Sequence, residues 1–231
     1  MPNTEIRLAV LETAEWYRED RMTTARPLFQ LLTQHIYGDP NWFHYATFTG
    51  PESFKETLYD LVHKRGVKYV YICTHGEDGK IQFASKNKTH PYDKTIVKCL
   101  EKTSLRGVLF GGCELASLAS DLSEGLKEKT LEEKGRLQES PWFAGYTESI
   151  DWMEASFLDL AFLRLVLGAQ EHDDQKMRAE FKLAVKARYH MAYALHLLDE
   201  DGFEAIRKRL GFSVYINGKE VEPSGDEAET E

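Results

Sequence analysis

Two apolar segments of the sequence each end in a residue that could do chemistry. The first, VKYVYICTHG, ends in His75 and Gly76, and the second, RGVLFGGC, ends in Cys113. A thiol that attacks a carbonyl carbon needs a nearby base and N–H donors that stabilise the oxyanion. Adjacent parallel strands would bring these groups to one edge of a sheet. The pattern therefore predicts a cysteine hydrolase, which we interpret as a peptidase.

Gly76 strengthens the interpretation of His75 as a functional residue. A glycine lets its own N–H approach a substrate carbonyl without a Cβ in the way, so Gly76 is a candidate oxyanion donor. Taken without Cys113, His75 would be better explained as a histidine that hydrogen-bonds a loop.

Cys113 follows the small residue Gly112 and precedes a predicted helix. The free N–H groups at a helix N-terminus favour a thiolate, so Cys113 is the candidate nucleophile. The alternative is a buried core cysteine, which is the commonest role of a lone cysteine. Cys73, inside a strand, and Cys99, on a helix face, fit that structural role.

The elements that would position these residues follow an alternating pattern. Apolar runs alternate with amphipathic stretches, which predicts an α/β fold with a mostly parallel sheet flanked by helices. We expect strands at residues 5–12, 43–49, 67–74, 107–112 and 141–150, helices at 26–35, 51–66, 93–101, 117–130, 154–167 and 174–198, a small hairpin at 77–85, and finally a short helix and an Asn217–Gly218 turn. Right-handed connections then place His75 and Cys113 at the same carboxyl edge.

Composition limits the other classes of function. The chain has 231 residues, of which 42% are hydrophobic, and a formal net charge of −9. We expect one domain over residues 1–218 and an acidic, disordered tail over 219–231. An acidic protein is not expected to bind nucleic acid or an anionic membrane. The tail supplies six of the negative charges: Glu220, Glu222, Asp226, Glu227, Glu229 and Glu231.

Three cysteines do not make a disulfide framework, and no secretory signal opens the sequence, so we expect a cytoplasmic protein. The longest apolar run, FLDLAFLRLVLGA, is interrupted by Asp159 and Arg164 and is too short to span a bilayer. Cys73, His75 and the downstream His90 do not have the spacing of a zinc site, and phosphate-binding glycine motifs are missing. We therefore expect no metal and no cofactor.

An apolar strand ending in His-Gly, followed by a second apolar strand ending in a small residue and Cys, resembles the caspase-like (clan CD) cysteine peptidases. The segments CELA at Cys113 and WFAGYTESIDWMEASFLDLAF look most like the CHAT branch of that group. The resemblance covers residues 6–168 and implies a caspase-like three-layer sandwich. The sequence departs from the family in its extra C-terminal helices, because the predicted helix 174–198 extends beyond the common core. The resemblance also implies a protein or peptide as substrate.

The resemblance implies a role for each candidate residue. Cys113 would be the nucleophile, His75 the proton donor to the leaving amine, and the N–H groups of Gly76 and Cys113 the oxyanion hole. The substrate would lie extended beside the strand around residues 143–147. Glu148 and Asp151 are candidates for a pocket that accepts arginine or lysine. The remaining candidates at the substrate site are Gly112, which clears space, and Glu114.

Two of the acidic candidates also have a plainer interpretation. Asp151 fits equally well as the cap of the following helix, and Glu114 could face solvent or stabilise a helix N-terminus. CHAT modules often carry repeat or sensor domains, so a regulatory protein partner or processing is expected here, with a role in prokaryotic stress or defence. Two other functions stay open: a catalytically silent module that binds peptides or partners, and a glutaminase-like amidotransferase with a downstream His172 and Asp174.

Overall fold

The computed structural model describes residues 6–14, 24–83, 88–90, 94–101, 103–132, 141–173 and 183–223. A seven-stranded sheet forms the centre of the molecule, in the order β10-β9-β8-β7-β3-β1-β2. The strands are β1 (Leu8–Thr13), β2 (Phe43–Phe48), β3 (Tyr69–Cys73), β7 (Gly107–Gly111), β8 (Trp142–Tyr146), β9 (Phe212–Ile216) and β10 (Lys219–Glu220). The first five strands pair in parallel, and β9 and β10 run antiparallel.

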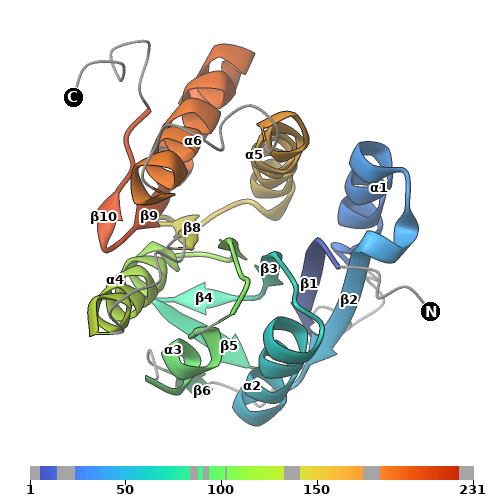
Figure 1. Cartoon of the computed structure of the whole chain (residues 1–231), viewed down its shortest axis with the longest axis vertical. Coiled ribbons are helices and arrows are strands. Elements are labelled where there is room, and N and C mark those ends of the chain that lie inside the picture. Colours follow the sequence, from blue (N-terminus) through green and yellow to red (C-terminus); the bar gives the residue numbers. More distant parts are fainter. Residues whose placement is uncertain are drawn as a thin grey trace.

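Helices cover both faces of this sheet (Figure 1). One face packs against α1 (Arg26–Tyr37), α5 (Trp152–Asp173), α6 (Leu183–Leu198) and α7 (Glu204–Leu210). The other face packs against α2 (Pro51–Tyr59), α3 (Lys94–Leu100) and α4 (Ala116–Glu132). The predicted α/β class, with a mostly parallel sheet between two layers of helices, is confirmed.

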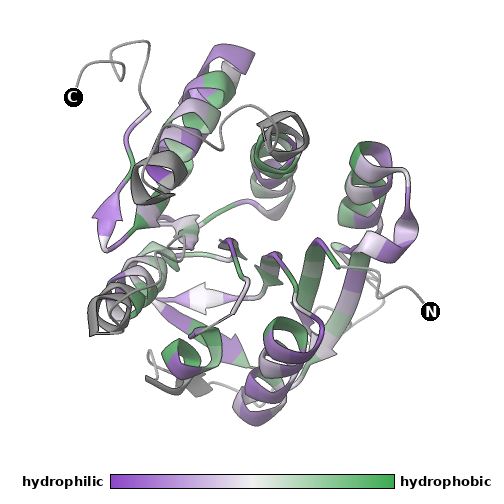
Figure 2. Ribbon diagram, in the orientation of Figure 1, coloured by the Kyte–Doolittle hydropathy of each residue, from purple (hydrophilic) through white to green (hydrophobic). Residues whose placement is uncertain are grey.

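The sequence explains why these elements form. Every residue of β1, β3, β7 and β8 is buried, as expected for strands covered on both faces. Apolar and polar residues both occur along α1 and α2 (Figure 2), and the buried apolar residues of these helices pack against the sheet. None of the helices in the described ranges is long and apolar enough to cross a lipid bilayer.

A second, small antiparallel sheet stands beside the main one. It contains β4 (Gly76–Glu77), β5 (Lys80–Phe83) and β6 (Lys88–His90), in the order β4-β5-β6. The hairpin of β4 and β5 was predicted from its Asp-Gly turn, whereas β6 was not. The remaining short elements are η2 (Pro40–Trp42), η3 (Asp60–Lys64) and η4 (Asp199–Phe203).

The C-terminal part of the fold differs from the prediction. β9 and β10 were missed, and the ordered chain continues past residue 218, where we expected the tail to begin. Val221 donates its N–H to Val214 and is 3% exposed, so burial of an apolar side chain holds this segment on the sheet. Residues 224–231 of the predicted tail lie outside the described residues, as do residues 174–182 of the predicted long helix.

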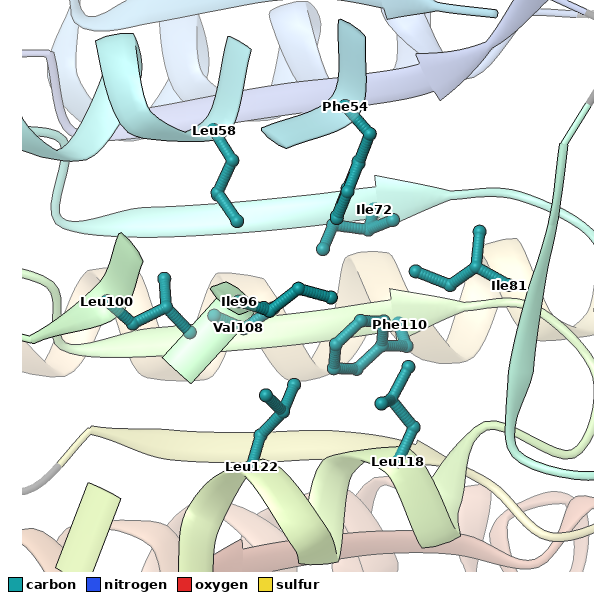
Figure 3. Close-up of a pocket in the computed structure, with 10 residues that line it drawn as sticks. All are labelled: Phe54, Leu58, Ile72, Ile81, Ile96, Leu100, Val108, Phe110, Leu118 and Leu122. Atoms are coloured by element: carbon teal, nitrogen blue, oxygen red, sulfur yellow. The ribbon is translucent and has the colours of Figure 1, made fainter. Parts of the chain in front are cut away.

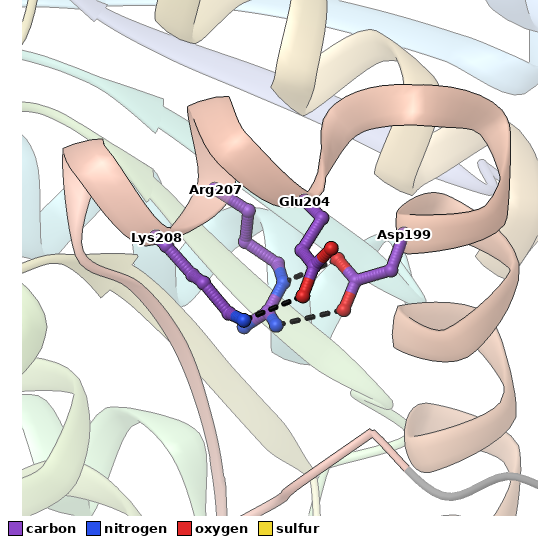
Figure 4. Close-up of polar contacts among 4 residues, drawn as sticks. All are labelled: Asp199, Glu204, Arg207 and Lys208. Atoms are coloured by element: carbon purple, nitrogen blue, oxygen red, sulfur yellow. Dashed lines mark hydrogen bonds and ion pairs between the residues drawn. The ribbon is translucent and has the colours of Figure 1, made fainter.

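An ion-pair pattern holds α7 against the end of α6 (Figure 4). The guanidinium of Arg207 donates two hydrogen bonds to Asp199, at 2.7 and 2.8 Å, and so connects α7 to the residue that follows α6. The second pair, Lys208 with Glu204, lies within α7. The chain reverses between these groups at Gly202, whose φ of 91° suits glycine. This turn directs the chain into β9.

The helix α5 is less buried than its sequence indicates. The segment 154–167 is apolar nearly all round, which predicted a buried helix. Met153 and Phe157, one turn apart, are 51% and 57% exposed. One face of α5 is therefore on the surface while the other packs on the sheet.

Candidate active site

His75 and Cys113 lie at the carboxyl edge of the central sheet, after the ends of neighbouring strands. β3 and β7 pair in parallel up to Cys73 and Gly111, so each candidate stands two positions beyond the last paired residue. Neighbouring strands are about 4.8 Å apart, and this register brings both backbones to the same edge. His75 is exposed and Cys113 is partly exposed, so solvent reaches both residues.

Two glycines keep the strand ends in contact beyond the paired region. A Cβ on Gly112 would overlap the carbonyl oxygen of Thr74, and a Cβ on Gly76 would overlap the carbonyl oxygen of Cys113. The backbone that carries His75 and Gly76 therefore packs directly on the backbone that carries Gly112 and Cys113. Glycine is needed at both positions for this close approach.

The small sheet holds the backbone of His75. The carbonyl oxygen of His75 accepts the N–H of Gln82 at 2.9 Å, and the buried hydroxyl of Thr74 donates to the carbonyl oxygen of Gln82 at 3.1 Å. Asp78 and Gly79, with φ of 49° and 70°, form the turn between β4 and β5. Positive φ at both positions is typical of a two-residue hairpin turn.

The sulfur of Cys113 lies against the segment that enters α5. It accepts the N–H of Ile150 at 3.4 Å and lies 4.0 Å from the carbonyl oxygen of the same residue. Cys113 also comes shortly before α4, which begins at Ala116. The thiol is thus near the start of two helices, of which the sequence indicated only one.

Asp151 and Glu148, the two residues predicted to bind a basic side chain, differ in their surroundings. The Asp151 carboxylate accepts the N–H groups of Met153 and Glu154 at 3.0 and 3.1 Å, and so caps α5. Glu148 is exposed, and its carboxylate accepts only a 3.4 Å hydrogen bond, from Thr147, among the contacts of the described residues.

Glu114 is partly buried and does not simply face solvent. One carboxylate oxygen accepts the N–H of Asp78 at 3.1 Å, and the other accepts the hydroxyl of Ser149 at 3.3 Å. The side chain therefore joins the turn of the hairpin to the segment that follows β8.

The expected pairing of substrate along residues 143–147 is wrong for β8 itself. β8 pairs with β7 on one side and with β9 on the other, so Phe143 and Ala144 have partners on both sides. The error comes from the missed strand β9, which occupies the position proposed for substrate. The segment after β8, Thr147 to Ser149, is exposed and therefore remains accessible at the carboxyl edge of the sheet.

A buried acid lies below this edge. Asp159 on α5 is 0% exposed and accepts hydrogen bonds from the hydroxyls of Tyr71 at 2.9 Å and Tyr146 at 2.6 Å. Burial raises the pKa of Asp159 to about 7, while the two tyrosine hydrogen bonds act in the opposite direction. Burial also raises the pKa of both tyrosines well above the usual value. The only sequence signal for this cluster is an acidic residue inside an apolar helix.

A second buried acid, Glu12, is the last residue but one of β1 and holds the start of α1. It accepts the hydroxyls of Thr24 and Tyr45 at 2.6 and 2.5 Å, and the N–H of Ala25 at 3.0 Å. Both oxygens of the buried carboxylate therefore accept hydrogen bonds.

The other two cysteines occupy the places that the sequence predicts. Cys73 is 0% exposed in β3, and burial, followed by the nearby Glu12, raises the pKa of its thiol well above the usual value. Cys99 lies on α3 and is partly exposed, and its carbonyl oxygen is 2.8 Å from the His63 ring. Neither of these two cysteines forms a disulfide, and Cys113 does not form one either.

No known protein-family model matches the chain, and no curated protein matches its sequence. Among solved structures, the chain is similar to a secreted C11 cysteine protease from Bacteroides thetaiotaomicron, determined in complex with an irreversible peptide inhibitor. The two sequences are 8% identical and the TM-score is 0.43. The similarity covers 92% of this chain and 66% of the protease chain.

A small apolar cavity lies elsewhere, between the sheet and α2, α3 and α4 (Figure 3). Its volume is about 10 Å³, and ten apolar side chains line it, including Phe54, Leu58 and Phe110. With no polar group in its lining, it is a packing defect rather than a catalytic site.

Within the described ranges, no group of three or more histidine, cysteine or acidic side chains is placed to hold a metal ion.

Proposed function

We propose that this protein is a caspase-like cysteine endopeptidase that cleaves a protein substrate with Cys113 and His75. The observation that carries the proposal is the parallel register of β3 and β7, which brings two strand ends with complementary chemistry to one exposed edge. The close packing of Gly76 and Gly112 supports it, because a glycine is needed at both positions to bring the two segments together.

The proposed reaction follows from these groups. The thiolate of Cys113 attacks the carbonyl carbon of the scissile peptide, and the N–H groups of Gly76 and Cys113 stabilise the oxyanion. His75 donates a proton to the leaving amine as the C–N bond breaks, which gives a thioester. Water then attacks the thioester, restores the thiol and releases the second product. No third carboxylate is needed, because a thiolate is already a competent nucleophile.

We propose Glu148 as the determinant of specificity. Its carboxylate is exposed beside the edge, where it can form a charge-assisted pair with arginine or lysine before the cleaved bond. Asp151 is less suited to this role because it already caps α5. Gly112 contributes space and close packing. The substrate backbone would pair with the segment 147–149 rather than with β8.

Regulation by a partner protein or by processing, a cytoplasmic location, and a role in prokaryotic stress or defence also belong to the proposal. Regulation and the role in stress or defence are supported only by the resemblance of the sequence to the CHAT branch, whereas the cytoplasmic location is supported by the cysteine content of the sequence. The CHAT assignment itself rests on the residues around Cys113 and on the strand and helix that follow.

The amidotransferase alternative is disfavoured by the position of its histidine. His172 lies within α5, 20 residues after the start of the helix at Trp152. At 1.5 Å per residue, this places the backbone of His172 about 30 Å along the helix from the end that lies near Cys113. A histidine at that distance cannot serve the same thiol.

A peptide-cleavage assay tests the proposal. The protein is incubated with a peptide library that varies the residue before the scissile bond, and the products are identified by mass spectrometry. We expect cleavage after basic residues and a loss of at least about 10³-fold in rate for Cys113→Ala and for His75→Ala, with unchanged circular dichroism. Cys99→Ala removes a thiol elsewhere and should keep full activity.

Two outcomes would overturn the proposal. Retained cleavage in either dyad variant removes the dyad. Peptide binding without any cleavage by the unmodified protein identifies the silent binding module instead. A preference for aspartate before the cleaved bond would exclude Glu148 as the specificity determinant.

A further inference from the structure

We propose that Glu114 is a positioning residue that holds the two walls of the site around Cys113, an inference that rests on the proposed peptidase function. One wall is the hairpin of β4 and β5, which begins directly after His75. The other is the segment 147–151, which brings the N–H of Ile150 to the sulfur of Cys113. Glu114 directly follows Cys113 and lies between the two walls.

Glu114 makes two hydrogen bonds to each wall. Towards the hairpin, its carboxylate accepts the N–H of Asp78 at 3.1 Å and its carbonyl oxygen accepts the N–H of Gly79 at 2.9 Å. Towards the other wall, its N–H donates to the carbonyl oxygen of Glu148 at 3.2 Å and its carboxylate accepts the Ser149 hydroxyl at 3.3 Å. Side chain and backbone thus connect the same two segments.

The backbone of Glu114 adopts a conformation that side chains usually avoid. Its φ is 55°, in the left-handed region, which costs a residue other than glycine about 1 kcal/mol. Glycine would relieve this strain but would lose both carboxylate contacts. The combination of left-handed backbone and long acidic side chain is explained if the side chain is needed to reach both walls.

The hydrogen bonds of Glu114 distinguish positioning from substrate binding. Each carboxylate oxygen already accepts a hydrogen bond from the protein, and the residue is partly buried. The neighbouring Glu148 has its carboxylate exposed and is the better partner for a basic substrate side chain. Glu114 therefore acts on the substrate through the walls that it holds.

The position of the two walls affects the rate of cleavage, because catalysis depends on where the oxyanion donor lies relative to the sulfur of Cys113. Gly76, the proposed oxyanion donor, lies on the hairpin wall, whereas the N–H beside the sulfur belongs to Ile150 on the other wall. A displacement of about 1 Å in such a site can cost about 10²-fold in rate. Loss of the Glu114 carboxylate would let the walls move relative to Cys113.

The test compares Glu114→Ala with Glu114→Gln in the full-length protein. A glutamine can accept the Asp78 N–H with its oxygen and donate to the Ser149 oxygen with its amide, so it keeps both contacts without the charge. We expect Glu114→Ala to lower kcat by about 10- to 100-fold with KM within about two-fold, and Glu114→Gln to retain most of kcat. Asp121→Asn, which changes an exposed acid on α4 outside both walls, should leave both constants unchanged.

Substitution of the partner provides a second test. Ser149→Ala removes one of the two carboxylate contacts and should cause a smaller loss of kcat. Combined with Glu114→Ala it should cause no further loss, because both substitutions break the same contact. An equal rise of KM in Glu114→Ala and Glu114→Gln would assign the carboxylate to substrate binding and overturn the proposal.

Hydrogen exchange separates this inference from the proposed function. In Glu114→Ala, the amides of residues 77–80 and 148–151 should exchange faster, while those of β3 and β7 keep their protection. This result is measurable even if the protein cleaves no peptide. In that case the positioning role of Glu114 stands and the peptidase proposal fails. Unchanged exchange in both segments would overturn the positioning role of Glu114, whatever the activity.

Discussion

The buried carboxyl group of Asp159 makes the stability of this protein depend on pH in a defined direction. Its pKa is about 7 in the folded protein, against an ordinary value of 3.8, because α5 and the sheet exclude water from it. Between these two values the folded state holds a proton that the unfolded state has released. The free energy of unfolding should therefore fall as the pH rises through this range, and level off above about pH 7.

The size of the effect follows from the shift. One pKa unit corresponds to about 1.4 kcal/mol, so the whole contribution is about 4 kcal/mol, of which about 2.5 kcal/mol is lost between pH 5 and pH 7. Asp159→Asn keeps the size of the side chain and removes the group that titrates. The free energy of unfolding of this variant should not show that loss. The difference in stability between the variant and the unmodified protein should therefore shift by about 2.5 kcal/mol in favour of the variant between pH 5 and pH 7.

Urea unfolding followed by circular dichroism at a series of pH values measures this difference. Asp121→Asn, on the exposed side of α4, is the matched control and should follow the unmodified protein. Parallel curves for Asp159→Asn and the unmodified protein would refute the reasoning, because they would show that the carboxyl group titrates alike in the folded and unfolded states.

Two further substitutions test the packing around the site. Gly112→Ala places a methyl group against the carbonyl oxygen of Thr74. We therefore expect cleavage to be nearly abolished and the free energy of unfolding to fall by about 2 kcal/mol. Full activity in a peptide assay would contradict the close approach of the two backbones. Asp151→Ala removes the cap of α5 and should lower the free energy of unfolding in urea by about 1 kcal/mol. The preferred residue before the cleaved bond should not change. Loss of a preference for basic residues would instead assign Asp151 to the substrate pocket.

The sequence predicts the main sheet and the meeting of its strand ends because both follow from local rules. Continuous apolar runs such as the one before His75 indicate strands buried on both faces, and right-handed connections bring their carboxyl ends together. The prediction failed for β9, although the signal was present. Phe212, Val214 and Ile216 alternate with more polar residues before an Asn-Gly turn, which is a strong hairpin signal.

The contacts that complete the site could not be predicted from the sequence. The hydrogen bonds of Glu114 to Asp78 and Ser149 join residues 36 and 35 positions apart. The contact from Ile150 to the sulfur of Cys113 is made by a backbone N–H, which any residue would supply. Such contacts depend on where tertiary packing places two loops, and no residue pattern records that.

The most direct test of the central claim is labelling with a peptide that carries a thiol-reactive group. The claim is that Cys113 lies beside His75 at an edge that binds a peptide and activates the sulfur. We predict a single adduct on Cys113, located by mass spectrometry, with Cys73 and Cys99 unlabelled and with much slower labelling in His75→Ala. Equal labelling of Cys113 and Cys99 would contradict the claim.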